Sequence, residues 1–284
     1  MASKSKRIAV QNETIKAFGL GQYTTPKGNN IVINKDDVIN CIKNTKYHTF
    51  KEVDQELRKR GIMTDHKTKV LLFNKDSLEA GVMLQHNGYN PAVLNMASFK
   101  NPGGGYLNGA GAQEESLFRR TCLHLCLDGE KKNLLYPIAY DAAIYSKDVP
   151  VVRRSEDLDY EFVEKYKKLS IISSSAYKCG AGEVYTDKIK KIMKYKLEMI
   201  FKLGILYEHD SLVLGAFGCG AYHNPANIIA EICKELIQEY DGYYRCIAFA
   251  ILDDRNATIN GAIHGYIDGN LETFRKILDI EIIN

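Results

Sequence analysis

The chain has 284 residues, of which 45% are hydrophobic and 26% are charged, and its formal net charge is +3. A charge this small, spread evenly along the sequence, does not by itself indicate a surface for duplex nucleic acid. The basic start MASKSKR lacks the apolar core of a secretory signal, and no stretch approaches about 18 uninterrupted apolar residues, so we expect a cytoplasmic or nuclear protein that is not secreted and has no membrane partner.

The length predicts one domain with an extension, because a single domain usually has about 100 to 200 residues. We expect a helical N-terminal extension over residues 1–66 and a second domain over residues 67–284. Within the extension, Asp36 to Lys59 carries apolar residues at uneven helical spacing among many charges, and a break at Gly61 and Thr64-Asp65 precedes the first strand. No compositional linker separates the two parts, so we expect them to pack as one unit.

Short apolar runs with helical patterns between several of them predict a layered α/β fold. Strands that alternate with helices favour a largely parallel, buried sheet. The strand candidates, in chain order, are Val70 to Phe73, Ala92 to Leu94, Pro137 to Ala143, Ser170 to Ser173, Leu212 to Gly215 and Cys246 to Leu252.

The segment Asn101 to Glu115, NPGGGYLNGAGAQEE, is the most informative of the chain. Its glycines Gly103 to Gly105 let the backbone approach a bulky anionic ligand where a side chain would collide. Gln113, Glu114 and Glu115 then open an amphipathic run, Ser116 to Leu127, which we expect to be one helix. The combination predicts a loop that clamps a ligand next to an acid.

An ordinary surface loop is the alternative interpretation of this segment. Glutamates in the first turn of a helix also suit the positive end of the helix dipole. An isolated glycine run or glutamate pair is therefore weak evidence of function, and a second motif is needed to favour a site.

The seven cysteines do not show the spacing of a metal site. No Cys-x-x-Cys pair exists, and within the expected helix Cys122 and Cys126 share a face while His124 points elsewhere. The odd count predicts reduced thiols of a cytosolic or nuclear protein, with no bound metal.

In the segment Lys188 to Lys196, lysines alternate with Ile and Met at helical spacing. This pattern favours a solvated helix face over a polymer-binding stripe.

The second motif is Leu212 to Tyr222, LVLGAFGCGAY, which indicates a buried strand followed by a glycine-rich turn. Asn224 and Pro225 are suited to the N-cap and first position of a helix that continues to about Gln238. A strand, a Gly-x-Gly turn and a helix N-terminus can bind phosphate through free backbone amides. Neither glycine loop matches the P-loop or the G-x-G-x-x-G pattern, which disfavours a phosphotransferase and a hydride-transferring dinucleotide enzyme.

Together the two motifs resemble those of the microbial-type poly(ADP-ribose) glycohydrolases. Asn95 to Glu115 is similar to the Gly-Gly-Gly and Gln-Glu-Glu signature of that family, and GAFGCGAYHNP at 215 to 225 is similar to its diphosphate loop. RIAVQNETIKAFGLGQYTT at 7 to 25 resembles the N-terminal segment of the family, and with the terminal strand Ile247 to Asp253 the resemblance runs through most of the chain.

The resemblance implies a macrodomain-like three-layer α/β/α sandwich with a mixed central sheet and an N-terminal helical extension. It implies a metal-independent glycosidase that hydrolyses ribose–ribose O-glycosidic bonds of poly(ADP-ribose), reverses ADP-ribosylation and needs no cofactor. Its partners would be ADP-ribose and poly(ADP-ribose) on proteins, with nucleic acid bound only if it is ADP-ribosylated, and we expect a monomer. Hydrolysis of mono-ADP-ribosylated protein or nucleobase, or ADP-ribose binding without catalysis, are the alternatives.

The resemblance also implies roles for single residues. Glu115 would be the catalytic acid and base, Glu114 would orient the ribose through its hydroxyls, and Asn95 would bind the distal ribose. The two glycine loops would lie on either side of the diphosphate. The expected substrate-binding residues are Asn95, Asn101, Gly103, Gly104, Gly105, Gln113, Phe217, Gly218, Cys219, Gly220, Ala221 and Tyr222.

Several of these positions have a simpler interpretation. Phe217 and Tyr222 are as consistent with core packing as with ribose contact, and Cys219 is better explained as a space-filling residue than as a nucleophile.

Asp253 and Asp254 end the last strand, where the adenine would lie. The run SSSAYKCGAGE at 173 to 183 lacks the proline that the family tends to have there, so the adenine pocket and the polymer exit are where this chain is expected to differ.

Overall fold

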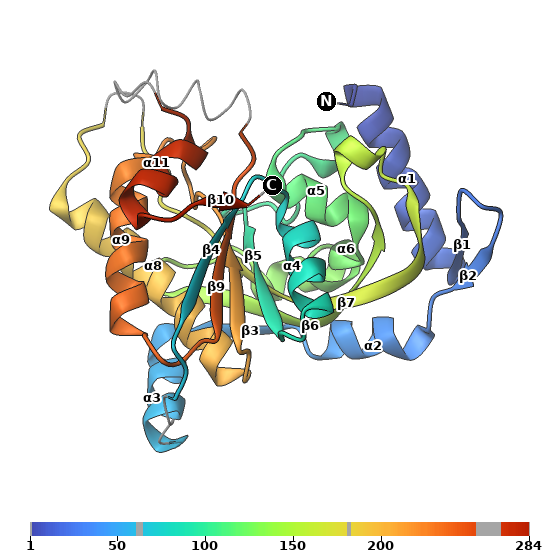
Figure 1. Ribbon diagram of the computed structural model, residues 1–284. Helices are drawn as coiled ribbons and strands as arrows, with labels where there is room; N and C mark the ends of the chain where they lie inside the picture. Colours follow the sequence, from blue (N-terminus) through green and yellow to red (C-terminus); the bar gives the residue numbers. More distant parts are fainter. Residues whose placement is uncertain (1, 61–64, 181–182, 254–267, 284) are drawn as a thin grey trace.

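A mixed sheet between two layers of helices forms the body of the molecule (Figure 1). The computed structural model describes residues 2–60, 65–180, 183–253 and 268–283. Its large sheet has eight strands in the order β10-β4-β9-β8-β5-β7-β6-β3, and a separate two-stranded sheet pairs β1 with β2. This is the three-layer α/β/α architecture that we predicted.

The strands are β1 (Gln22–Thr24), β2 (Asn30–Val32), β3 (Lys46–Thr49), β4 (Lys69–Phe73), β5 (Pro91–Met96), β6 (Ala142–Arg153), β7 (Phe162–Ser174), β8 (Ser211–Leu214), β9 (Cys246–Ala250) and β10 (Ile282–Ile283). The α-helices are α1 (Lys4–Leu20), α2 (Lys35–Lys43), α3 (Phe50–Arg60), α4 (Ser77–His86), α5 (Gln113–Arg120), α6 (Leu123–Leu127), α7 (Lys132–Leu135), α8 (Asp187–Leu206), α9 (Ala226–Glu239) and α11 (Asn270–Leu278). Three short 3₁₀ helices complete the description: η1 (Tyr106–Asn108), η2 (Gly129–Lys131) and η3 (Glu156–Leu158).

The sheet is parallel from β10 to β7 and antiparallel beyond it. The pairs β10–β4, β4–β9, β8–β9, β5–β8 and β5–β7 are all parallel. The pairs β6–β7 and β3–β6 are antiparallel. Because β5, β7 and β8 run in the same direction, their carboxyl ends meet at one edge of the sheet, which is where open α/β sheets bind ligands.

Five of the six predicted strands are present, and one prediction is wrong for most of its length. Pro137 to Ala143 was expected to be a strand, but β6 begins only at Ala142. Pro137 has no amide hydrogen to donate to a ladder, and Tyr140 and Asp141 form a turn. The strands β6 and β7 are longer than the apolar runs, because their hairpin carries exposed charged residues such as Lys165 that hide the strand pattern.

Each face of the sheet packs against its own group of helices. One core lies under α1, α2, α4, α5 and α6 and includes the fully buried side chains of Leu78, Phe118 and Leu123. The other lies under α3, α8, α9 and α11 and includes Phe201, Phe249 and Phe274. Figure 1 shows the two helix groups on opposite sides of the strands. Strands with apolar residues on both faces are what a buried parallel sheet requires.

The N-terminal extension is not purely helical, which corrects the predicted description of residues 1–66. It contains the β1–β2 hairpin and the edge strand β3, whose Tyr47 pairs with Ile144 of β6. The strand was missed because its four residues have no apolar alternation. The expected break at Gly61 and Thr64 lies outside the described residues.

The predicted helix over Ser116 to Leu127 is instead two helices, α5 and α6, with a bend between them. Thr121 has extended backbone angles and forms an isolated bridge with Val151. Its hydroxyl oxygen then accepts the amide hydrogen of Leu123, the first residue of α6, at 3.2 Å. A β-branched residue with extended backbone angles is a local reason for the bend.

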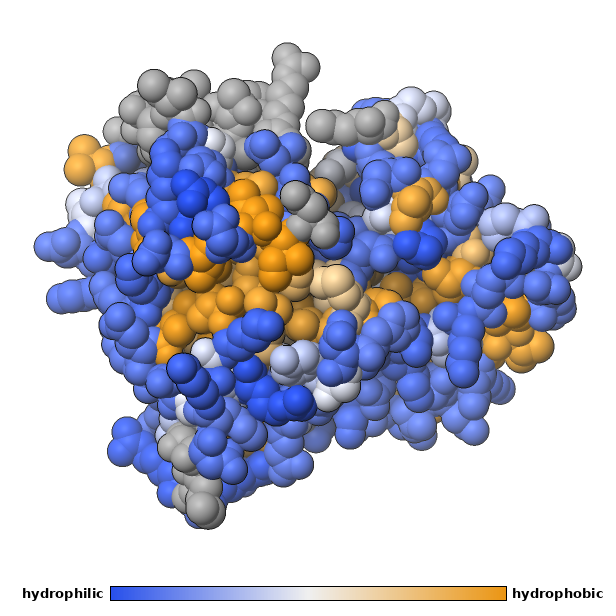
Figure 2. Space-filling view, viewed as in Figure 1, coloured by the Kyte–Doolittle hydropathy of each residue, from blue (hydrophilic) through white to orange (hydrophobic). Residues whose placement is uncertain are grey.

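One edge of the sheet is only partly covered. The short strand β10 pairs Ile282 and Ile283 with β4, and the side chain of Ile283 is 41% exposed. Figure 2 shows hydrophobic side chains gathered on this face of the molecule.

Among the described residues, no helix combines the length and the apolar character needed to cross a membrane.

A buried ion-pair network anchors the C-terminal end of α5 to α4. Arg120 is 1% exposed and contacts Asp76 at 2.7 Å and Glu79 at 3.1 Å. Its Nε also donates to the carbonyl oxygen of Arg153 at 3.2 Å. These contacts of Arg120 fix the position of α5, the helix that carries Glu114 and Glu115.

We predict that Arg120→Met lowers the free energy of unfolding by about 3 kcal/mol, because removal of one partner leaves two carboxylates without a buried counter-charge. Urea unfolding measures the change. The matched control is Arg154→Met, because Arg154 contacts the same Glu79 but its side chain is 47% exposed, so we expect a loss below about 1 kcal/mol. Equal losses in the two variants would contradict the anchoring role.

Candidate functional site

The site lies where the carboxyl ends of β5, β7 and β8 meet. The loop after β5 carries the first glycine run and leads through η1 into α5. The loop after β8 carries the second glycine run and leads into α9. Tyr222 joins them, because its hydroxyl oxygen accepts the amide hydrogen of Phe99 at 3.1 Å.

Backbone amides of the first glycine loop hold both carboxylates of α5. The amides of Ser98 and Gly103 donate to the two oxygens of Glu114 at 2.8 and 3.0 Å. The amide of Gly105 donates to Oε1 of Glu115 at 2.9 Å. Both glutamates are buried, at 4% and 8% exposure, although they lie in the first turn of a helix.

The glycines are required by packing within the protein, and the predicted approach of an anionic ligand to their backbone stays a prediction. Gly104 has φ +55°, and a Cβ there would lie 2.5 Å from Oε1 of Glu115. Gly103 has φ +73°, and a Cβ there would meet Tyr106 and Phe118 at 2.5 and 2.6 Å. The amide of Gly104 donates to the carbonyl oxygen of Asn101 at 2.9 Å, so all three glycine amides are used within the protein. The run therefore makes room for a carboxylate and the core instead of offering its amides to an anion.

Glu114 is the carboxyl group most perturbed by this environment. Burial raises the pKa of Glu114 to about 8, and the nearby charge of Glu115 adds to the rise. The hydrogen bonds from the amides of Ser98 and Gly103 oppose it, and so does the side chain of Asn95. A carboxyl group with a strongly perturbed pKa, next to a second carboxyl group, marks this loop as a candidate functional site.

Gln113 is a positioning residue. Its carbonyl oxygen accepts the amide hydrogen of Met96 at 2.9 Å, and its amide nitrogen donates to Ser77 at 2.9 Å and to Leu94 at 2.7 Å. Both ends of the side chain are therefore bonded to the end of β5 and the start of α4. A direct substrate contact by Gln113 stays a prediction, as it does for the exposed Asn101.

The second loop has free amides where the first does not. Within the residues that the structure describes, the amides of Gly218, Gly220, Ala221 and Tyr222 donate no hydrogen bond. Gly218 has φ +78°, and a Cβ there would lie 2.5 Å from the side-chain nitrogen of Asn224. A short run of free amides beside a positive-φ glycine is a feature of anion-binding loops.

Asn224 and Pro225 do not cap α9 as predicted. The helix begins at Ala226, with Pro225 in the N-cap position and no side-chain cap. The Asn224 side chain donates instead to the carbonyl oxygens of Tyr177 at 2.7 Å and Gly218 at 3.1 Å. It therefore holds the glycine loop against the segment after β7. The predicted end near Gln238 is confirmed, since α9 ends at Glu239.

Two predicted substrate-binding residues of the second loop have buried side chains. Phe217 is 0% exposed and packs in the core under α8 and α9, so the structure favours core packing over ribose contact. Cys219 is also 0% exposed, and burial raises its pKa well above the usual range. Its amide donates to the carbonyl oxygen of Ala216 at 3.0 Å. The complete burial of the Cys219 side chain agrees with the predicted space-filling role.

The part of the segment SSSAYKCGAGE that the structure describes before residue 181 lies against the second loop. The amide of Cys179 donates to the carbonyl oxygen of Tyr222 at 3.0 Å, and a Cβ on Gly218 would lie 2.6 Å from Ala176. Without a proline, the segment is tied to the loop by these contacts. Of the residues expected near the adenine, Asp253 donates its amide to Asn74 at 3.1 Å, and Asp254 lies outside the described residues.

Three buried polar atoms of the site have no hydrogen-bond partner within the described part of the chain. They are Oδ1 of Asn95, Oγ of Ser174 and the hydroxyl of Tyr136. Asn95 is fully buried at the end of β5, where its Nδ2 donates to Ser173 at 3.0 Å. Unsatisfied buried polar groups are rare in native structures and need an explanation, and a polar ligand supplies one.

Tyr136 is the residue that sequence reasoning missed. Burial raises the pKa of Tyr136 well above the usual range, and the charges of Glu114 on α5 and of Asp128 act in the same direction, so Tyr136 lies near Glu114. The neighbouring Ile138 donates its amide to the carbonyl oxygen of Phe99 at 3.0 Å. No motif surrounds Tyr136, so only the folded chain reveals it.

Comparisons with known proteins agree with this geometry. The family model described as "Microbial-type PARG, catalytic domain" matches residues 11–154. A poly(ADP-ribose) glycohydrolase (PARG) structure from Thermomonospora curvata has a TM-score of 0.83 at 25% identity and covers 95% of this chain and 98% of its own. The structure of the same enzyme bound to the inhibitor ADP-HPD has a TM-score of 0.81 at 25% identity, with the same coverage.

A second bacterial structure is similar over a smaller part of the chain. The poly(ADP-ribose) glycohydrolase from Deinococcus radiodurans in complex with ADP-ribose has a TM-score of 0.71 at 25% identity. It covers 85% of this chain and 97% of its own. No curated protein sequence matches the chain.

We predict that the stability of the protein falls as pH rises from about 4.5 to about 8 through the titration of Glu114. In this window the unfolded chain has lost the proton that the native Glu114 keeps, so deprotonation favours unfolding by up to about 1.4 kcal/mol per pH unit. Urea unfolding of wild type and Glu114→Gln across the window measures the contribution. Parallel pH profiles for the two proteins would rule it out.

Proposed function

The chain belongs to the family of microbial-type poly(ADP-ribose) glycohydrolase catalytic domains, and from this membership we propose Glu115 as the acid and base of its reaction. The protein is a glycosidase that hydrolyses ribose–ribose O-glycosidic bonds of poly(ADP-ribose) and releases ADP-ribose. The family predicted from the two glycine-rich motifs is confirmed.

The observation that carries the proposal is the pair of buried carboxylates held by amides of one glycine loop. Each oxygen of Glu114 already accepts one amide hydrogen, at 2.8 and 3.0 Å. Glu115 accepts one, at 2.9 Å. A carboxylate has about four acceptor positions, so both groups keep capacity for a ligand. Glu115 is the less restrained of the two.

In the proposed reaction one carboxyl group acts twice. The Glu115 carboxyl group donates a proton to the departing ribose oxygen as the C–O bond breaks and positive charge develops on the anomeric carbon. A water molecule then attacks that carbon, and the Glu115 carboxylate accepts the proton that the water loses. The products are ADP-ribose and a shortened chain, and Glu115 returns to its protonated form.

Glu114 would orient the ribose instead of transferring the proton. Its fixed position, between the amides of Ser98 and Gly103, suits a group that receives ribose hydroxyls at defined angles. The unpartnered atoms of Asn95, Ser174 and Tyr136 would complete the polar contacts to the sugar.

The diphosphate would lie against the second glycine loop. The amides of Gly218, Gly220, Ala221 and Tyr222, which donate no hydrogen bond among the described residues, offer donors for its oxygens. The first run, Gly103 to Gly105, would face the ligand from the other side while the amides of Gly103 and Gly105 stay on the carboxylates. A bound diphosphate close to Glu115 would stabilise the developing cation, and such preorganised charge is commonly a large part of catalysis.

We further propose that the enzyme acts as a monomer in the cytoplasm or nucleus on polymer attached to proteins. All seven cysteines are free thiols, which suits a reducing compartment. Light scattering on the purified protein tests the monomer. The division into an extension over residues 1–66 and a catalytic domain over 67–284 stays a proposal, in which β3 belongs to the sheet of the second part.

We predict that Glu115→Gln lowers the rate of ADP-ribose release from automodified poly(ADP-ribose) at least about a hundredfold, because the amide keeps the shape and loses the proton. ADP-ribose affinity should stay within about tenfold of wild type. Chromatography of free ADP-ribose and titration calorimetry measure the two effects.

The control for this experiment is Glu56→Gln on α3, a glutamate away from the site whose side chain is 44% exposed, and this variant should leave hydrolysis unchanged. Unimpaired release by Glu115→Gln would remove Glu115 from the mechanism. A parallel reaction on singly ADP-ribosylated protein separates the substrates, since faster release from it would make mono-ADP-ribose the preferred target.

A further inference from the structure

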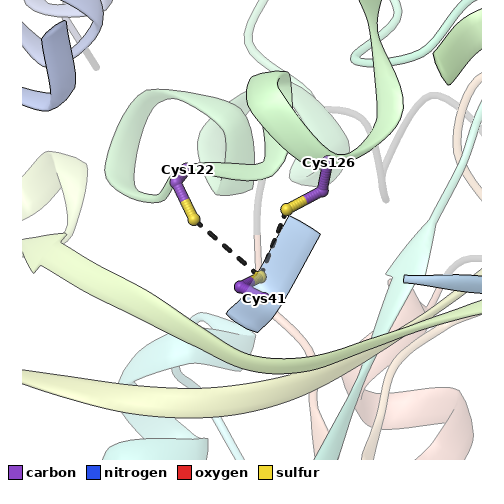
Figure 3. Close-up of side chains that lie close together, drawn as sticks. All are labelled: Cys41, Cys122 and Cys126. Atoms are coloured by element: carbon purple, nitrogen blue, oxygen red, sulfur yellow. Dashed lines mark hydrogen bonds between the residues drawn. The ribbon is translucent and has the colours of Figure 1, made fainter. Parts of the chain in front are cut away.

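Three buried cysteines from separate parts of the sequence lie close together in the protein core. Cys41 lies in α2, Cys122 immediately precedes α6, and Cys126 lies in α6 (Figure 3). All three are 0% exposed. Cys41 is 81 residues from Cys122 and 85 from Cys126 in sequence, so the spacing analysis had no means of joining them.

The sulfur atoms point toward one another. The Sγ of Cys41 lies 3.2 Å from that of Cys126 and 4.0 Å from that of Cys122. All three atoms lie within 4.8 Å of one another. A disulfide needs about 2.05 Å between sulfurs, and the three residues are free thiols.

These distances suit three sulfurs around one ion. With metal–sulfur bonds of about 2.3 Å, sulfur ligands at ordinary coordination angles lie roughly 3.8 to 4.0 Å apart. The Cys41–Cys122 distance already has this value, and the Cys41–Cys126 distance has to open by only about 0.6 Å. The cluster therefore needs little rearrangement to become a set of ligands.

The donor set selects the kind of ion. The group of potential ligands contains only the three thiols, with no carboxylate or imidazole among the described residues that share it. Thiolates prefer soft ions, foremost Cu(I), whereas structural zinc is almost always four-coordinate.

We propose that Cys41, Cys122 and Cys126 bind one Cu(I) ion through their three sulfur atoms. Binding releases the thiol protons to solvent, and the copper stays in the Cu(I) state. The ion would join α2 to α6 and so connect the N-terminal extension to the segment that follows α5. An ion that binds the native protein in preference to the unfolded chain raises its melting temperature.

The test is an anaerobic titration of the reduced, metal-free full chain with Cu(I) against a competing bicinchoninate chelator. We expect wild type to retain one equivalent of Cu(I) and to melt at a higher temperature when loaded. Cys126→Ala and Cys41→Ala should lose this equivalent. The matched control is Cys246→Ala, because Cys246 is equally buried but lies on β9, outside the cluster, and it should bind as wild type does.

X-ray absorption on the loaded wild type keeps the test independent of whether the variants fold. Three sulfur neighbours and no nitrogen or oxygen neighbour would support the site. Nitrogen or oxygen coordination, equal Cu(I) retention by Cys126→Ala and wild type, or no retention against the chelator would overturn it. Preferential retention of Zn(II) in a parallel titration would overturn the choice of ion.

Discussion

Hydrogen bonds from one glycine loop to two adjacent carboxylates are the constraint on which the site depends. The amides of Gly103 and Gly105 bind Glu114 and Glu115, and a side chain on Gly104 would occupy the place of the Glu115 carboxylate. The loop and the first turn of α5 are therefore one unit, and neither can keep its shape without the other. Two carboxyl groups are thus buried in the first turn of a helix, where its dipole helps to tolerate their charge.

The rest of the fold positions this unit next to the second glycine loop, whose backbone amides are used differently. The parallel strands β5, β7 and β8 end at one edge of the sheet, so the loops that follow them are neighbours. The first loop uses the amides of Gly103 and Gly105 on carboxylates, and the second leaves four amides without a hydrogen-bond partner among the described residues. In the proposed function, the acid therefore lies beside one glycine run and the diphosphate beside the other. Tyr222, bonded to the amide of Phe99, fixes the distance between them.

The sequence predicted the features that depend on local chemistry. Apolar runs identified most strands of the sheet, and the glycine and glutamate pattern identified the loop whose amides hold Glu114 and Glu115. It failed where long-range contacts decide the structure. The edge strand β3 exists because β6 offers a partner, and Thr121 interrupts the expected helix where it forms a bridge with Val151. Tyr136 and the meeting of Cys41 with Cys126 are products of tertiary packing, which no spacing in the chain encodes.

The central claim is that one ligand lies between the two glycine loops with its reacting ribose at Glu115. The most direct measurement is a crystal structure of the Glu115→Gln variant with ADP-ribose. The account predicts diphosphate oxygens within hydrogen-bond distance of the amides of Gly218, Gly220, Ala221 and Tyr222, and a ribose hydroxyl on Glu114. A diphosphate bound away from the second loop, or a ribose remote from both carboxyl groups, would contradict it.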